Sequence, residues 1–288
     1  MSIQSHVVAT SFGVIEYADV GSGPAILYAH GAGVGFDQGI AIADQFVAHG
    51  FRVIAISRFG YLRTPIPEYA SVALQADVYT GLLEILGIPS AAIIGVSAGA
   101  PSALEFAMRH PQRCAALVLV VPAAYESPEL APCARGPSQR FFLDYVLKIT
   151  LLYRAFCKVW PSVVIRDVLA TPPELVASAS ASERERVAGI LRDVTPLGQT
   201  RAGVELDMEL TIEPRTQDLK SISAPTLVIA AQDDLYRSYE NAKAIADAIR
   251  HALVVAYPTG GHLLVGHNEE AFAVTIAFLK GQALDRPS

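Results

Sequence analysis

The chain has 288 residues, 52% of them hydrophobic, and is long enough to bury a substantial core as one large α/β domain or two small ones. Its formal net charge is −6 and its Lys and Arg residues are scattered, which argues against the basic surface that nucleic-acid binding requires. Cys114, Cys133 and Cys157 lack the spacing of a metal site, and this predicts free thiols in a reducing compartment.

Neither the N-terminal segment nor the most apolar segment indicates export or membrane insertion. The N-terminal "MSIQSHVVATSFG" has no basic stretch followed by an apolar run, so we expect no secretory signal and a cytoplasmic protein. The most apolar region, "FFLDYVLKITLLYRAFCKVW", is interrupted by charges at Asp144, Lys148, Arg154 and Lys158. We therefore expect no transmembrane segment.

Up to about Val121, apolar runs typical of strands alternate with stretches that have helical spacing. Two short strands are predicted on either side of Gly13, and the apolar runs that follow predict strands at "AILYAHG", "FRVIAIS", "AAIIG" and "AALVLVVPAA". Helices are predicted over residues 37–49, "SVALQADVYTGLLEILG" and "GAPSALEFAMRHP".

The alternation stops at about Tyr125 and resumes after Arg215. Residues 125–215 predict helices and Pro-rich turns without a strand, and the last part predicts strands at "PTLVIAAQ" and "ALVVAYP" with helices over 238–250 and 268–280. The expected fold is α/β, with a mostly parallel eight-stranded sheet flanked by helices. Residues 1–124 and 216–288 would form the core domain, and residues 125–215 a helical cap.

The stretch "IIGVSAGAP" places Ser97 between a predicted strand and a predicted helix. Ligands bind beyond the carboxyl ends of strands in an α/β sheet, and Ser97 stands at such an end. A sharp strand-to-helix turn leaves little room beside the serine, and Gly95 and Gly99 supply small residues two positions away on each side. This G-x-S-x-G pattern predicts a nucleophile, although a plain strand-helix turn would use the same glycines.

A serine nucleophile needs a base and a third group that orients the base. Asp233 and Asp234 follow the predicted strand "TLVIA", and either could be the orienting acid. His262 lies in the Gly-Gly loop after the last predicted strand, and is favoured as the base over His267, which stands nearer the final helix. The chain order Ser, Asp, His is one of those known for this constellation.

The oxyanion of an acyl-transfer reaction needs two hydrogen-bond donors. The backbone N–H of Ala98, directly after the nucleophile, is one candidate. The second is expected from the loop "YAHGAGVG", where Ala32 is the first choice and Gly33 the second. His30 in that loop is interpreted as a structural histidine that hydrogen-bonds within the loop.

With these parts together, residues 1 to about 124 and 216–288 resemble the α/β-hydrolase superfamily. "AHGAGVG" resembles its oxyanion loop, "GVSAG" its nucleophile elbow, "PTLVIAAQDD" its acid-bearing strand and "GGHLLVGHNEEAF" its histidine segment. The resemblance implies a hydrolase of carboxylesterase type with a Ser-His-Asp triad, and no metal or organic cofactor.

The sequence departs from the family pattern at two places. Ala231 replaces a glycine that usually stands three residues before the acid, and this register points to Asp234. Ser57 takes the usual place of an acidic residue in "SRFGYLRTP". In the same loop Arg58 and Arg63 could contact a substrate carboxylate, but a surface or loop-stapling role is favoured.

The expected activity is hydrolysis of a small or medium, largely apolar ester through an acyl-enzyme. Aromatic and aliphatic residues at near-helical spacing in the cap favour such a substrate, and those expected to line its pocket are Phe142, Tyr145, Ile149 and Trp160. The resemblance leaves open a lactonase, a carbon–carbon hydrolase of ring-cleavage products, a cofactor-free perhydrolase and a non-catalytic receptor or scaffold. The apolar cap could also serve as a homodimer interface.

Overall fold

The computed structural model describes residues 4–123, 157–193, 198–212 and 218–281. One eight-stranded sheet forms its centre, with the strand order β1-β2-β4-β3-β5-β6-β7-β8. The strands are β1 (His6–Thr10), β2 (Gly13–Gly21), β3 (Ala25–Ala29), β4 (Arg52–Ser57), β5 (Ala91–Val96), β6 (Cys114–Val120), β7 (Thr226–Ala231) and β8 (Leu253–Tyr257). All neighbouring strands from β4 through β8 are parallel, whereas β2 is antiparallel to β1 and β4. The predicted mostly parallel eight-stranded sheet is confirmed.

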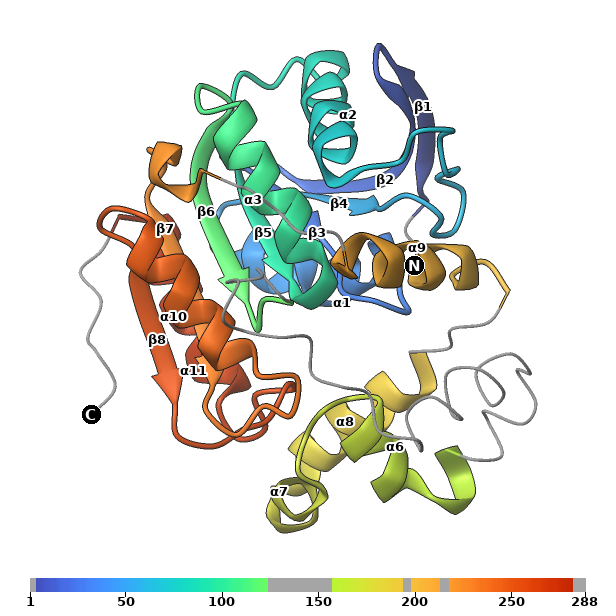
Figure 1. Cartoon of the computed structure of the whole chain (residues 1–288), viewed down its shortest axis with the longest axis vertical. Coiled ribbons are helices and arrows are strands. Elements are labelled where there is room, and N and C mark those ends of the chain that lie inside the picture. Colours follow the sequence, from blue (N-terminus) through green and yellow to red (C-terminus); the bar gives the residue numbers. More distant parts are fainter. Residues whose placement is uncertain (1–3, 124–156, 194–197, 213–217, 282–288) are drawn as a thin grey trace.

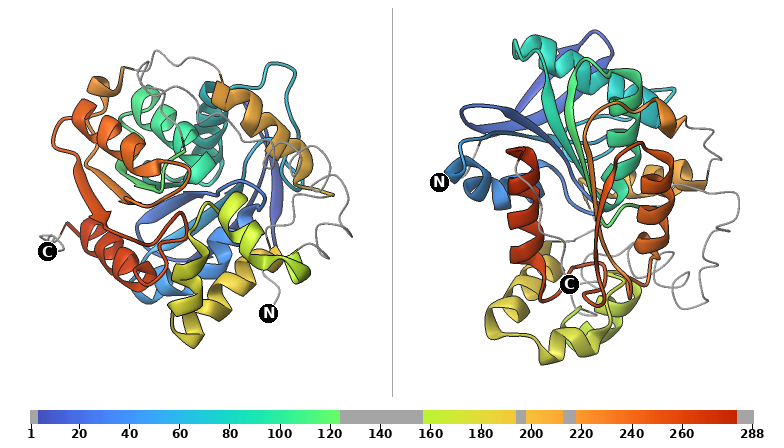
Figure 2. Two further views of the ribbon diagram at one scale, coloured as in Figure 1. Left: turned by 60° about the horizontal axis from the view of Figure 1, so that its bottom comes forward. Right: turned by 90° about the vertical axis from the view of Figure 1, so that its left-hand side faces the viewer.

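Helices cover both faces of the sheet, as the right-hand view of Figure 2 shows. On one face α1 (Phe36–Ala48) and α11 (Asn268–Leu279) pack against apolar side chains such as Ile26 and Val118. On the other face lie α2 (Val72–Ile85), α3 (Ala100–Arg109) and α10 (Ser238–Ala248). Every residue of β3 and β7 is buried, which explains why these strands read as unbroken apolar runs.

The chain between β6 and β7 adds helices beyond the carboxyl ends of the strands. Its described helices are α6 (Pro161–Asp167), α7 (Pro173–Ser178), α8 (Ala181–Asp193) and α9 (Arg201–Ile212), followed by the short turn η3 (Leu219–Ser221). Figure 1 shows α6, α7 and α8 grouped below the sheet, with α9 beside the loops that follow β3 and β4. No strand occurs in the described residues of this segment, as the sequence predicts. Its assignment to a cap over 125–215 stays a prediction.

Two expectations touch the apolar part of this segment. Phe142, Tyr145 and Ile149 lie outside the described residues. Trp160, directly before α6, is 54% exposed. Within the described ranges, no helix combines the length and the apolar character that crossing a membrane requires.

Candidate active site

Ser97 occupies a sharp turn at the carboxyl end of β5. It begins the single 3-10 turn η1 (Ser97–Gly99), which leads directly into α3. Its backbone φ is 48°, in the left-handed region that a non-glycine residue adopts only at a cost. This strained turn raises the serine above the end of the sheet, as a nucleophile elbow requires.

The two glycines that flank Ser97 are explained by close backbone contacts. A Cβ at Gly95 would lie 2.7 Å from the Cβ of Ala103 in α3. A Cβ at Gly99 would collide with the carbonyl oxygen of Ala29 at the end of β3. Any larger side chain at these two positions would therefore force the helix or the neighbouring strand away from the turn.

Ser97, His262 and Asp234 form a hydrogen-bonded row, and their catalytic roles stay predictions. The Oγ of Ser97 lies 2.9 Å from Nε2 of His262, and Nδ1 of His262 lies 2.7 Å from Oδ2 of Asp234. Because the carboxylate only accepts, Nδ1 carries the proton and Nε2 is the acceptor for the serine hydroxyl. The side chain of Asp234 is fully buried and that of His262 is 11% exposed.

The two adjacent aspartates have different partners. Asp234 also accepts hydrogen bonds from the backbone N–H of Tyr236 and from the Ser238 hydroxyl. Asp233 instead accepts the backbone N–H groups of Gly260 and Gly261, at 3.3 and 2.7 Å. Asp234 thus contacts the imidazole itself, while Asp233 holds the loop that carries it.

The loop after β3 lies beside Ser97 on the other side of the site. A Cβ at Gly31 would lie 3.5 Å from the Cβ of Ser97, an ordinary contact, so the loop passes directly beside the serine. Ala32 is exposed, whereas the backbone of Gly33 contacts the buried hydroxyl of Tyr61. This contact favours Ala32 over Gly33, and the roles of the Ala32 and Ala98 amides in binding an oxyanion stay predictions.

The chain matches a known protein family over most of its length. The model of the alpha/beta hydrolase fold family matches residues 24–268, which is most of the chain. The chain belongs to the alpha/beta hydrolase fold family. It is 26% identical over 276 residues to the uncharacterized hydrolase YcgS of Bacillus subtilis (strain 168), with 93% of this chain and 95% of the relative covered.

Two further similarities agree with that family. An alpha/beta hydrolase fold protein from Nakamurella multipartita superposes with a TM-score of 0.78 at 25% identity, covering 96% of this chain and 99% of the other. A 2-hydroxy-6-oxo-6-phenylhexa-2,4-dienoate hydrolase of Comamonas testosteroni is 29% identical over 124 residues, which is 41% of this chain and 43% of the relative. The family and the names of these relatives support a hydrolase.

In this hydrolase the loop after β3 is fixed by a buried polar network. His30 is fully buried, its Nδ1 lies 2.6 Å from the carbonyl oxygen of Gly31, and its Nε2 accepts the backbone N–H of Arg58. Burial and the nearby Arg58 charge hold the pKa of His30 well below its ordinary value, so the ring is neutral. It is a structural residue within the loop, as the sequence predicts.

Arg58 connects that loop to α9. Its guanidinium donates to the carbonyl oxygens of His30 and Gly31 and forms a bidentate ion pair with Asp207 at 2.5 and 2.6 Å. Asp207 also accepts the Tyr61 hydroxyl at 2.6 Å. Burial opposes the charge of Arg58, which is 2% exposed, but the carboxylate of Asp207 raises the pKa of Arg58 above its ordinary value.

The segment between α6 and α7 holds the opposite side of the site. The carbonyl oxygen of Ala170 accepts the backbone N–H groups of His262 and Leu235, at 3.3 and 3.0 Å. The Tyr236 hydroxyl donates to the carbonyl oxygen of Val168, and its ring meets that of His262 edge-on at 5.1 Å. The loops that carry the acid and the base are thus joined through this segment.

Several of these contacts have no clear sequence signal. Asp207 and Ala170 stand in residues 125–215, where the sequence predicts only helices and turns. Ser238 had a usable signal, because it opens a predicted helix four residues after Asp234. His267, the other candidate base, stacks on Tyr257 and lies 3.8 Å from Glu270 in the next turn of chain.

Proposed function

We propose that this hydrolase cleaves small or medium, largely apolar carboxylic esters through an acyl-enzyme on Ser97. The observation that carries the proposal is the hydrogen-bonded row from Ser97 through His262 to Asp234. A serine becomes a useful nucleophile when a positioned base removes its proton and a third group orients that base.

In the proposed reaction the same imidazole transfers the protons of both steps, acylation of Ser97 and hydrolysis of the acyl-enzyme. His262 takes the Ser97 proton at Nε2 while Oγ attacks the ester carbonyl, and Asp234 stabilises the imidazolium through Nδ1. The backbone amides of Ala32 and Ala98 bind the oxyanion. His262 then protonates the departing alcohol, and a water molecule hydrolyses the acyl-enzyme by the reverse sequence.

The choice of an ester over a ring-cleavage product depends on the arginines near the site. A dienoate substrate carries a carboxylate, which needs a cationic partner. Arg58 is 2% exposed and bound to Asp207, and Arg63 donates to the buried carboxylate of Glu16. Both arginines are thus engaged in fixing loops, which supports an uncharged substrate.

The test is the time course of p-nitrophenyl butyrate hydrolysis by the wild type and by Ser97→Ala. We expect sustained turnover that is lost in Ser97→Ala and in His262→Ala. His267→Ala is the matched histidine control and should retain activity. Turnover that survives in Ser97→Ala would exclude the mechanism.

Parallel assays separate the remaining candidates. A lactone and a ring-cleavage dienoate should be turned over more slowly than the ester, and perhydrolysis is measured by adding hydrogen peroxide with acetate. A single stoichiometric burst without further turnover would contradict the proposal and favour a receptor that is acylated once.

A further inference from the structure

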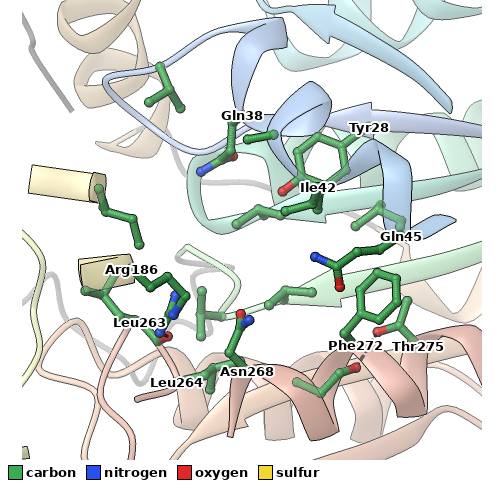
Figure 3. Close-up of a pocket in the computed structure, with 18 of the residues that line it drawn as sticks. Tyr28, Gln38, Ile42, Gln45, Arg186, Leu263, Leu264, Asn268, Phe272 and Thr275 are labelled. Carbon is green, nitrogen blue, oxygen red and sulfur yellow. Dashed lines mark hydrogen bonds between the residues drawn. The ribbon is translucent and has the colours of Figure 1, made fainter. Parts of the chain in front are cut away.

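A cavity of about 660 Å³ lies next to His262, between α1, α8 and α11. Its floor is the face of the sheet at β3, β5, β6 and β7, and Phe46 and Phe272 meet edge-on at 4.7 Å among its lining residues. This volume falls within the range of about 300–1,000 Å³ that is typical of small-molecule sites. Figure 3 shows side chains of α1 and α11, among them Gln45 and Asn268, turned toward its interior.

The cavity is lined by a tyrosine hydroxyl that the described residues leave available. Tyr28 on β3 is 5% exposed as a whole residue, and no described residue forms a hydrogen bond with its hydroxyl. In Figure 3 this hydroxyl and the side-chain amides of Gln45 and Asn268 point toward the interior. A ligand that carries a hydrogen-bonding group at this depth would gain a hydrogen bond to this hydroxyl.

The charges at the cavity do not favour an ionic ligand. Arg186 is paired with Glu183 at 2.6 Å and also donates to the carbonyl oxygen of Leu263. Asp37 accepts the backbone N–H of Gly35 at the start of α1. The positive charge of Arg186 is therefore neutralised, and the carboxylates of Asp37 and Asp193 in the lining disfavour an anion. Most of the other lining residues are apolar, which favours an uncharged molecule.

The position of the cavity relative to the reacting atoms indicates which part of a substrate it receives. His262 and Val96 line it, whereas Ser97 does not. In ester cleavage the bond between the acyl carbon and the alcohol oxygen breaks, Ser97 Oγ bonds to the acyl carbon, and Nε2 of His262 gives its proton to the alcohol oxygen. The alcohol oxygen must consequently lie within hydrogen-bond distance of Nε2 of His262, so an alcohol that extends past this residue would enter the cavity.

We propose that this cavity, resting on the esterase function above, is the subsite for the alcohol part of the substrate. The preferred alcohol is uncharged and apolar along its length, and carries a hydrogen-bonding group at its far end that reaches Tyr28. The acyl part lies outside this cavity. Side chains of α1, α8 and α11 would then determine which alcohols the enzyme accepts.

The first experiment fills the cavity from α8. Gly189 lines it, and among the described residues a Cβ there would have only Arg192 Nη2 within 4 Å, at 3.7 Å. Gly189→Leu should lower kcat/KM for hexyl and benzyl acetate by on the order of tenfold and leave methyl acetate and methyl hexanoate unchanged. Ala181→Leu adds the same side chain to an exposed position of the same helix and should change none of them.

A second variant tests the polar end of the subsite. Tyr28→Phe keeps the ring and removes the hydroxyl, so kcat/KM should fall about fivefold for an ω-hydroxyhexyl acetate and stay constant for hexyl acetate. Equal losses for both esters, or a loss confined to the acyl series in Gly189→Leu, would overturn the assignment.

Direct binding separates the subsite from the esterase proposal. Calorimetric titration of Ser97→Ala with benzyl alcohol should give saturable binding that is lost when Gly189→Leu is added. Binding without ester turnover by the wild type would retain the cavity as a neutral-alcohol site but refute its role as a leaving-group subsite. Ester turnover without such binding, and without an effect of Gly189→Leu, would refute the subsite and leave the esterase function intact.

Discussion

The two sides of the candidate active site are both fastened to the segment between β6 and β7, but by different kinds of contact. On the side of the acid and the base, the carbonyl oxygen of Ala170 accepts backbone N–H groups from His262 and Leu235. On the side of the predicted oxyanion loop, the carboxylate of Asp207 binds Arg58 and Tyr61. The first anchor is made by the main chain, and the second depends on one buried charge.

Because the two contacts differ in kind, we expect the two sides of the site to differ in their sensitivity to side-chain substitution. The hydrogen bonds at Ala170 do not use its side chain, but Ala170 is buried and has a φ of 43°, so a larger residue there would disturb them by displacing the backbone. The ion pair fails when either partner is lost, because the remaining charge stays buried without compensation. The segment between β6 and β7 therefore helps to hold the loops of the candidate site in position.

The largest expected effect breaks the row on the acid side. Asp234→Asn should lower kcat about 10⁴-fold, because an amide at this position no longer favours the imidazole tautomer that accepts the Ser97 proton. Asp233→Asn is the adjacent control, and steady-state kinetics should place it within about tenfold of the wild type, since one carbonyl oxygen still accepts a Gly261 N–H. Reversed effects would make Asp233 the acid of the triad.

The next largest effect breaks the anchor on the oxyanion-loop side. Asp207→Ala should lower the free energy of unfolding by about 3–5 kcal/mol, because it leaves the Arg58 guanidinium buried and unpaired. Chemical denaturation measures this loss. The double variant Arg58→Met/Asp207→Leu should recover most of the stability while kcat stays reduced, since the loop at His30 and Gly31 no longer receives the guanidinium hydrogen bonds. Full recovery of kcat would show that the network does not position the loop.

A smaller effect tests the outer part of the same side through pH. Burial alone would raise the pKa of Glu16, but hydrogen bonds from Arg63, Ser5 and Ser57 lower it below its ordinary value of 4.5. The carboxylate therefore contributes stability above the unfolded pKa, and this contribution is lost as the pH falls through the lower, folded pKa.

Arg63→Ala should consequently lower the free energy of unfolding by about 1–2 kcal/mol at pH 7. The loss is smaller than for a fully buried ion pair, because Arg63 is half exposed and solvent screens its charge. The difference from the wild type should shrink as Glu16 becomes protonated in both proteins. Thermal melts from pH 7 to pH 3 measure it, and a constant difference across this range would exclude the ion pair as its cause.

The smallest effect concerns the tyrosine beside the base. Tyr236→Phe removes the hydrogen bond to the Val168 carbonyl but keeps the ring against His262. Because Tyr236 is 45% exposed, the loss of stability should be at most about 1 kcal/mol, and kcat should change less than twofold. Tyr236→Ala, which also removes the ring, should reduce kcat further if the ring holds the imidazole in place.

Much of this framework could be predicted from local patterns in the sequence. The central strands are buried on both faces, so their apolar runs mark them without any knowledge of their neighbours. Ser97 is recognisable because Gly95 and Gly99 meet a local steric demand. His262 and Asp234 follow because the ends of parallel strands converge at one edge of the sheet.

Contacts across long sequence distances were not predictable in the same way. Arg58 and Asp207 are 149 residues apart, and nothing in the helix that contains Asp207 distinguishes it from a solvent-exposed acidic residue. The cavity beside His262 combines residues from α1, α8 and α11, which follow no common spacing. Such features depend on how the helices pack against one another, and the hydrophobic periodicity of a single helix or strand does not reveal this.

The backbone of Ser97 has a consequence for protein engineering. Its φ of 48° is one that glycine adopts freely, so Ser97→Gly should relieve about 1 kcal/mol of strain and raise the melting temperature. Selection of variants for heat resistance alone would thus reward the loss of the proposed nucleophile. A directed-evolution campaign on this protein should couple each thermal challenge to a turnover screen.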